Sequence, residues 1–178
     1  MISNLLNEKE RELLKLDVRK RIYIIVKKFA GCHFREIERK SKLSTGSVNY
    51  HLNHLIKYGL IKQEKLDNNI LFFPQSFKGN TKLLGLLRKE SIRKIILFIL
   101  INENCNHKQI VRFVGLTPST VSWHLKRLVK NKIIETFKKK REKKYKLLLK
   151  REEIILLLNS YRDSFLDPLI DQIIKKKK

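Results

Sequence analysis

The sequence predicts a mainly helical α+β fold, in which two copies of one small domain each end in a β-hairpin. Three observations indicate this fold class. With 178 residues, the chain is long enough for one or two domains of ~100–200 residues each. It aligns with itself when Ile22 is placed on Ile95, and within each aligned segment the apolar residues change from helical to strand spacing. We therefore expect tandem domains, with additional helices at both termini.

The internal repeat defines the organisation of the chain. Segment 22–61 aligns with 95–134 without a gap, and 11 of these 40 positions are identical. Most of the identities are apolar residues at helical spacing, although Cys32 also matches Cys105. The alignment therefore indicates two copies of one domain.

Three helices are expected in each copy. The first carries apolar residues on one face, and the second spans 34–41 or 107–114. The third begins after Ser44 or Thr117, hydroxyl residues that suit an N-cap. Its buried stripe has i, i+4, i+7 spacing: Val48, Leu52 and Leu55 in the first copy, and Val121, Leu125 and Leu128 in the second.

A hairpin follows the third helix in each copy. Strands are expected at 60–66 and 70–73, around a turn at 67–69, and at 133–137 and 144–148, around a tip at 138–143. Three helices followed by a hairpin form a winged helix-turn-helix domain. The predicted organisation is an N-terminal helix (1–16), a first winged domain (17–75), a linker (76–83), a second winged domain (84–149), a C-terminal helical segment (150–174) and a basic tail (175–178).

The charge of the chain favours an anionic partner. Lys and Arg number 41 against 17 Asp and Glu, which gives a net charge of +24 and a pI of about 10.2. Residues 1–80 contain 16 basic and 8 acidic residues (+8), whereas 81–178 contain 25 and 9 (+16). We expect the second copy to dominate electrostatic binding to nucleic acid.

Cysteine content and hydropathy indicate the compartment. Two cysteines do not form a disulfide framework, and the N-terminal residues lack the pattern of a secretory signal. The longest apolar run, 95–101, has seven residues, whereas a membrane span needs ~20. The expected location is cytoplasmic, in association with the nucleoid and without a membrane partner.

Two motifs resemble those of known regulators. Residues 116–128 (LTPSTVSWHLKRL) are similar to the recognition-helix motif of MarR/ArsR-like winged-helix regulators, and 33–37 with 43–52 resemble a companion motif. Together with 161–167 (YRDSFLD), they resemble archaeal predicted transcriptional regulators with two winged-helix domains, from Asp17 to the C-terminus. The resemblance implies transcription regulation through sequence-specific binding of double-stranded DNA, without a particular gene or effector.

Helical geometry selects the side chains expected to face DNA. At about 100° per residue, the side of each third helix opposite its apolar stripe is offered to the major groove. The hairpin tip of the second copy, rich in Lys and Arg, is expected to meet the flanking backbone or minor groove. The predicted DNA-binding residues are Ser119, Thr120, Trp123, Lys126, Arg127, Lys130, Lys138, Lys139, Lys140, Arg141, Lys143 and Lys144 in the second copy, and Thr45, Ser47, Tyr50, Asn53, His54 and Lys57 in the first.

Some of these side chains have a second interpretation. Trp123 and Tyr50 could instead be partly buried against the hairpin, although their exposed angle in both copies favours DNA contact. His51 and His124 lie beside the buried stripe. They are expected to be hydrogen-bonded boundary residues, with phosphate contact as the alternative.

Other function classes receive less support. Cys32 and Cys105, with His33 and His107, could suggest a metal sensor, but neither cysteine has a second cysteine nearby, so buried structural thiols are favoured. No motif of an enzyme is present, and no catalytic residue, metal or cofactor is expected. A non-specific architectural, chromatin or replication protein that binds DNA is the main alternative, followed by RNA binding.

The C-terminal segment carries an apolar stripe outside both repeats. Ile154, Leu158, Tyr161 and Phe165 are spaced along one face of a helix. The stripe either covers a domain of the same chain or binds a second chain. Relatives of the resembled family usually dimerise through terminal helices, so a homodimer is expected, with a tandem monomer as the alternative.

Overall fold

The computed structural model describes residues 12, 14–165 and 170, which fall into two compact units. Unit 1 comprises Met1–Thr81 and unit 2 comprises Lys82–Lys178. The N-terminal helix expected over 1–16 lies almost wholly outside the described residues, and so does the basic tail at 175–178.

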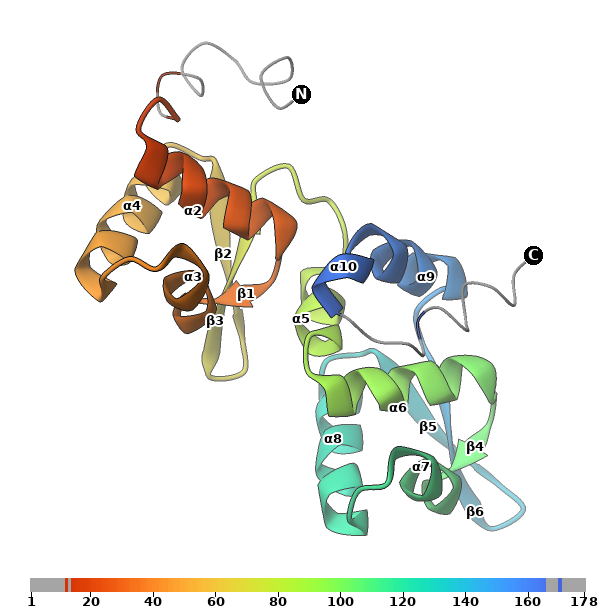
Figure 1. The fold of residues 1–178 in the computed structure, drawn as a ribbon. Helices are drawn as coiled ribbons and strands as arrows, with labels where there is room; N and C mark the ends of the chain where they lie inside the picture. The colour runs from red at the N-terminus through yellow and green to blue at the C-terminus, as the bar shows by residue number, and fades with distance from the viewer. Residues whose placement is uncertain (1–11, 13, 166–169, 171–178) are drawn as a thin grey trace. The chain divides into compact units, whose positions relative to one another are not determined.

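Within the described residues, unit 1 contains the helices α2 to α4 and a three-stranded antiparallel sheet (Figure 1). The strand order is β1-β3-β2, so the short β1 pairs with β3 and not with its neighbour in sequence. The elements are α2 (Asp17–Lys28), β1 (Cys32–His33), α3 (Phe34–Ser41), α4 (Thr45–Lys57), β2 (Ile61–Leu66) and β3 (Asn69–Pro74).

Unit 2 repeats this plan and adds helices on both sides. Each element from α2 to β3 has a counterpart of the same length in unit 2, in register with the sequence repeat, and the second sheet has the matching order β4-β6-β5. The predicted mainly helical fold of tandem winged domains is thus confirmed. The elements are α5 (Thr81–Leu87), α6 (Glu90–Ile101), β4 (Cys105–Asn106), α7 (His107–Val114), α8 (Pro118–Lys130), β5 (Ile134–Lys139), β6 (Glu142–Leu147), α9 (Arg151–Ser160) and α10 (Arg162–Phe165).

Apolar side chains from α2, α3 and α4 form the core of unit 1. Ile22 and Val26 lie one turn apart on α2 and are fully buried, together with Ile37 of α3 and Val48 of α4. Burial of each such side chain contributes ~1.5–3 kcal/mol. This packing fixes α4 on the core and leaves its opposite side exposed.

Helix α5 lies partly where the sequence predicts a linker. The linker is expected over 76–83 and the second domain from 84, but α5 starts at Thr81 and already buries Leu83. Gly85, in the middle of this short helix, weakens the helical pattern, which explains the difference.

Three of the four residues in the C-terminal stripe are buried within the chain, and Tyr161 is half-buried. Ile154 and Leu158 of α9 are fully buried, and Phe165 of α10 is nearly so. Arg151 anchors α9 to α6, because its guanidinium donates a hydrogen bond of 2.8 Å to the carbonyl oxygen of Leu100. The expected homodimer therefore loses its premise of an unpaired apolar face.

No helix among residues 12, 14–165 and 170 combines the length and apolar character needed to cross a bilayer.

Candidate nucleic-acid interface

A tight turn between α7 and α8 presents α8 on the surface of unit 2. Helix α7 ends at Gly115, whose φ of 66° lies in the left-handed region that glycine adopts without strain. Thr117 then caps α8, accepting a hydrogen bond of 3.3 Å from the backbone N–H of Thr120. Pro118 takes the first helical position, where no backbone donor is needed. The predicted N-cap is confirmed.

The corresponding turn in unit 1 uses different residues. Lys42 takes the left-handed position with φ 56°, and Ser44 caps α4 by accepting a hydrogen bond of 3.3 Å from the N–H of Ser47. The hydroxyl of Thr45, one of the predicted DNA-binding groups, donates to the carboxylate of Glu38 in α3. Thr45 therefore helps to join the two helices of the corner.

Helix α8 separates its buried and exposed sides as predicted. Val121, Leu125 and Leu128 are buried in the core. On the other side, the predicted DNA-binding side chains are exposed or half-buried: Ser119, Trp123, Lys126 and Lys130 are exposed, whereas Thr120 and Arg127 are half-buried.

Trp123 lies between two cations on this exposed side. Its side chain is 55% exposed, so the alternative of burial against the hairpin is not what the structure shows. The ammonium of Lys89 lies 5.1 Å from the ring centroid and the guanidinium of Arg127 lies 5.8 Å away. Both distances fit cation–π contacts. Lys89, which directly precedes α6, is absent from the predicted residues because nothing in the local pattern links it to α8.

The two matching histidines are buried more deeply than expected. His124 is 2% exposed and His51 is 8% exposed, and the Nδ1 atom of each has no hydrogen-bond partner among the described residues. The predicted hydrogen-bonded boundary role is therefore wrong for these atoms. Burial, with Lys89 and Arg127 nearby, lowers the pKa of His124 to about 4, and burial with Arg19 nearby lowers the pKa of His51. Each imidazole is thus neutral near pH 7.

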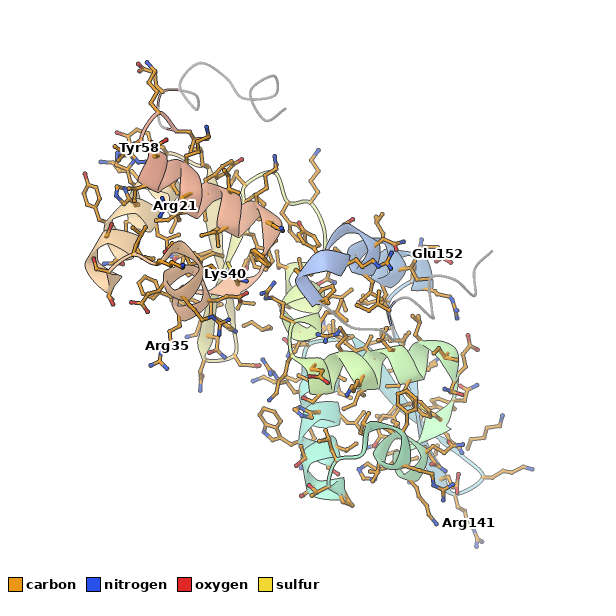
Figure 2. The ribbon with its side chains drawn as sticks, viewed as in Figure 1. Arg21, Arg35, Lys40, Tyr58, Arg141 and Glu152 are labelled. Carbon is orange, nitrogen blue, oxygen red and sulfur yellow. The ribbon has the colours of Figure 1, made fainter. Side chains whose placement is uncertain are left out.

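The wing of unit 2 is longer, and its turn tighter, than predicted. Strands β5 and β6 extend to Lys139 and from Glu142, so only Lys140 and Arg141 form the turn. Their φ angles are 48° and 67°, both in the left-handed region, as a two-residue hairpin turn requires. Arg141 extends from the end of the hairpin (Figure 2). The sequence does not reveal these strand ends because a run of Lys residues shows no apolar period.

The ladder sorts the basic residues of this wing onto two faces. On one face, Lys144 pairs with Glu142 at 2.6 Å and Lys146 pairs with Glu135 at 2.7 Å. The Lys144 side chain is only 17% exposed, so it is not the free cation that the sequence predicts. On the other face, Lys138 lies directly opposite Lys143. Among the described residues, no ion pair is formed by Lys138, Lys139, Lys140, Arg141 or Lys143.

A groove of about 350 Å³ separates α8 from this wing. Lys126 and Lys130 border it from the helix, and Lys143 borders it from β6. Three ammonium groups therefore surround one groove beside the exposed side of α8.

Sequence comparisons match both units to described domains. A model described as an N-terminal HTH domain covers residues 16–82, and one described as winged helix-turn-helix DNA-binding covers 88–135. An uncharacterized HTH-type transcriptional regulator of Methanocaldococcus jannaschii is 30% identical over 125 residues, which is 70% of this chain. The chain spans about a third of that relative, since the match covers 31% of its length.

The chain carries two helix-turn-helix domains, the second of which matches a DNA-binding description. These domains indicate a non-enzymatic protein. The narrower resemblance to MarR/ArsR-like regulators is not part of either domain description.

Helix α4 of the first domain has an aromatic surface where α8 of the second has a basic one. Tyr50 is 63% exposed, and the rings of Tyr50, His54 and Tyr58 follow one another along α4, with centroids 6.4 Å and 4.6 Å apart. Tyr58 is not among the predicted residues, because it lies beyond the stretch that the sequence assigns to DNA. Asn53 and Lys57 are exposed or half-buried beside this row.

The first wing is correspondingly weak in positive charge. Its turn is formed by Asp67 and Asn68, and Asp67 has a φ of 54°. The two helix-turn-helix domains therefore have the same backbone arrangement. They differ in the side chains on the exposed side of α4 or α8 and on the wing.

The cysteines occupy buried strand positions. Cys32 and Cys105 lie in the edge strands β1 and β4, and neither forms a disulfide. Burial raises the pKa of Cys105 to about 11, which disfavours the thiolate that a metal would need. His107 is engaged with Ser122, its Nε2 lying 2.9 Å from the hydroxyl oxygen. Among the described residues, no three His, Cys, Asp or Glu side chains gather as a metal site would need.

Proposed function

We propose that this protein is a transcription regulator that binds duplex DNA through both winged domains, with unit 2 supplying most of the electrostatic affinity. The observation that carries this proposal is the wing of unit 2, beside the exposed side of α8. Five of its cations form no ion pair within the described part of the chain, although Lys139 lies opposite Glu142 in the ladder. Like charges directly opposite each other on a ladder destabilise a sheet, so Lys138 and Lys143 favour an anion between or beside them. The regulator description of the relative supports the same function.

Helix α8 is proposed to enter the major groove. Its exposed side combines hydroxyl groups, an indole and cations, which can hydrogen-bond to base edges, contact a thymine methyl group or bind phosphate. Three lysines border the groove between α8 and the wing, so this groove suits the phosphate backbone of the DNA strand at the edge of the major groove. The wing then reaches the flanking minor groove or backbone.

Helix α4 is proposed to read a different sequence. Ser47, Tyr50, Asn53, His54 and Lys57 offer mostly neutral groups, whereas α8 offers mostly cations and hydroxyls. Two different readers in one chain favour an asymmetric DNA element. We expect the protein to be nucleoid-associated, as chromosomal binding implies.

Selection from a random DNA pool tests sequence-specific recognition. The proposal requires an enriched asymmetric motif, and the absence of any motif would support the architectural alternative.

Alanine replacement of Lys138, Lys139, Lys140 and Arg141 tests the wing. The slope of log K against log salt should fall by ~0.9 for each of these side chains that touches a phosphate in the natural chain. Lys82→Ala with Lys150→Ala removes exposed charge elsewhere in unit 2 as a control. An unchanged slope would remove the wing from the interface.

A single chain is proposed to suffice for binding, in place of the predicted homodimer. Burial of Ile154 and Leu158 removes the surface on which the dimer argument depends. Light scattering of the full-length protein at micromolar concentration should therefore give a monomer. A dimer would restore the sequence-based prediction of association through the terminal helices.

A further inference from the structure

Helices α6 and α7 of unit 2 border a hollow of about 460 Å³, and none of the residues assigned to DNA lines it. The rings of Phe98 and Phe113 lie against each other there, with centroids 4.6 Å apart and planes 32° apart. Phe113 is 43% exposed, so an aromatic surface is left in contact with water. The wall is completed by Asn106, Lys108, Gln109 and Arg112.

The hollow carries uncompensated positive charge. Lys108 and Arg112 are exposed, and neither side chain makes an ion pair or hydrogen bond within the described part of the chain. Helix α7 contains no acidic residue. The carboxylate next to the wall is Glu142, which accepts a hydrogen bond of 3.3 Å from Asn106 and is already paired with Lys144.

Unit 1 has no such aromatic pair on its equivalent surface, since Ile25 stands at the position of Phe98 and the ring that it has there, Phe29, matches Asn102. There the ammonium of Lys40 lies 3.7 Å from the ring centroid of Phe29 and 4.0 Å from the carboxylate of Glu36. One residue thus covers the ring and is neutralised. At the matching positions unit 2 has Phe113 in place of Lys40 and Gln109 in place of Glu36.

These replacements are not needed for folding, since unit 1 builds the same helix pair without them. We propose that the hollow binds a small amphipathic anion, a carboxylate on an aromatic or branched apolar body. The apolar body packs on Phe98 and Phe113, and the carboxylate pairs with Arg112, whose planar guanidinium suits bidentate contact. The volume lies within the ~300–1,000 Å³ of small-molecule sites. A free acid of this size matches both the concave aromatic surface and the adjacent cations.

The first test compares an acid with its neutral counterpart. Full-length protein labelled with ¹⁵N is titrated with 3-phenylpropionate and with 3-phenylpropanamide, and amide shifts are followed by NMR. The acid should shift resonances of α6 and α7 and bind about tenfold more tightly than the amide, because hydrogen bonds to a charged group are the stronger ones. Equal affinity for the two compounds would overturn the proposal.

The second test uses variants matched between the two units. Arg112→Gln should weaken binding of the acid about tenfold, whereas Arg39→Gln, at the matching position of unit 1, should leave it unchanged. Gln109→Glu with Phe113→Lys gives unit 2 the residues of unit 1 and should abolish binding. In the natural chain, the Gln109 side chain accepts a hydrogen bond from the N–H of Asn106 as part of a capping box, and the introduced glutamate can accept the same bond. Dispersed NMR spectra will confirm that the double variant is folded.

Besides equal affinity for acid and amide, three results would overturn the proposal: no binding of the free acid, equal effects of Arg112→Gln and Arg39→Gln, or full binding by the double variant. The first would leave the aromatic pair to a different occupant, such as an acidic segment of a partner protein.

Discussion

The turn of the second wing is expected to favour DNA binding at the expense of stability. Lys140 and Arg141 both have left-handed φ angles, which cost side chains with a Cβ ~1–3 kcal/mol each. Asn-Gly is the pair preferred for a two-residue hairpin turn of this kind. Replacing Lys140→Asn and Arg141→Gly should remove ~2 kcal/mol of strain from the folded state. The greater freedom of glycine in the unfolded chain should offset ~1 kcal/mol of this gain in stability.

The net gain of about 1 kcal/mol is large enough to measure. For a domain of this size it corresponds to an increase in Tm of ~4–8 °C, read by differential scanning calorimetry or circular dichroism. The same variant should bind DNA more weakly, and the slope of log K against log salt should fall by ~1.8 if both side chains contact phosphate. Fluorescence anisotropy between low and high salt measures that slope.

Two results would refute this reasoning separately. A variant that is less stable than the natural chain would show that the turn is not strained. A variant that is more stable but keeps its salt slope would show that the turn residues do not touch DNA. Lys82→Gln with Lys150→Gln, which removes the same charge from exposed positions elsewhere in unit 2, is the matched control.

Three further predictions concern unit 2. Trp123 is the single tryptophan, so its emission should change when duplex DNA is added, and constant emission at saturation would place it away from the DNA. Leu158→Ala should destabilise unit 2 by ~2–5 kcal/mol in urea unfolding, whereas Leu156→Ala, at an exposed position of the same helix, should cost far less. The pKa of His124 is lowered from 6.5 to about 4, so the unfolded chain binds a proton that the folded chain does not between these values. Stability should therefore fall by up to ~3 kcal/mol as the pH falls from 6.5 to 4, and His124→Gln should remove this dependence.

The sequence predicts most of what depends on local pattern. The stripe of Val121, Leu125 and Leu128 and the caps at Ser44 and Thr117 are set by residues within one or two helical turns, so the structure confirms them. The internal repeat then extends the description of one unit to the other.

The remaining features depend on partners that are distant in sequence or share no apolar period. Lys89 meets Trp123 only because the start of α6 packs near α8. The sequence places Glu142 in the hairpin tip, but β6 already begins there, so Glu142 and Lys144 lie on the same face of one strand, 2.6 Å apart. The sequence argument assigns the C-terminal stripe to a second chain, because a sequence cannot show that the same chain covers it.

The close recurrence of the backbone has a consequence for how the two copies have diverged. Left-handed positions recur in register with the repeat, and at three of them one copy has glycine where the other bears a side chain: Gly31 and Asn104, Lys42 and Gly115, and Gly59 and Lys132. The glycines are thus divided between the copies, and neither domain holds the less strained residue at every turn. At each of these three positions, the glycine of one copy can replace the strained residue of the other. The chain therefore contains the substitutions needed for a more thermostable variant.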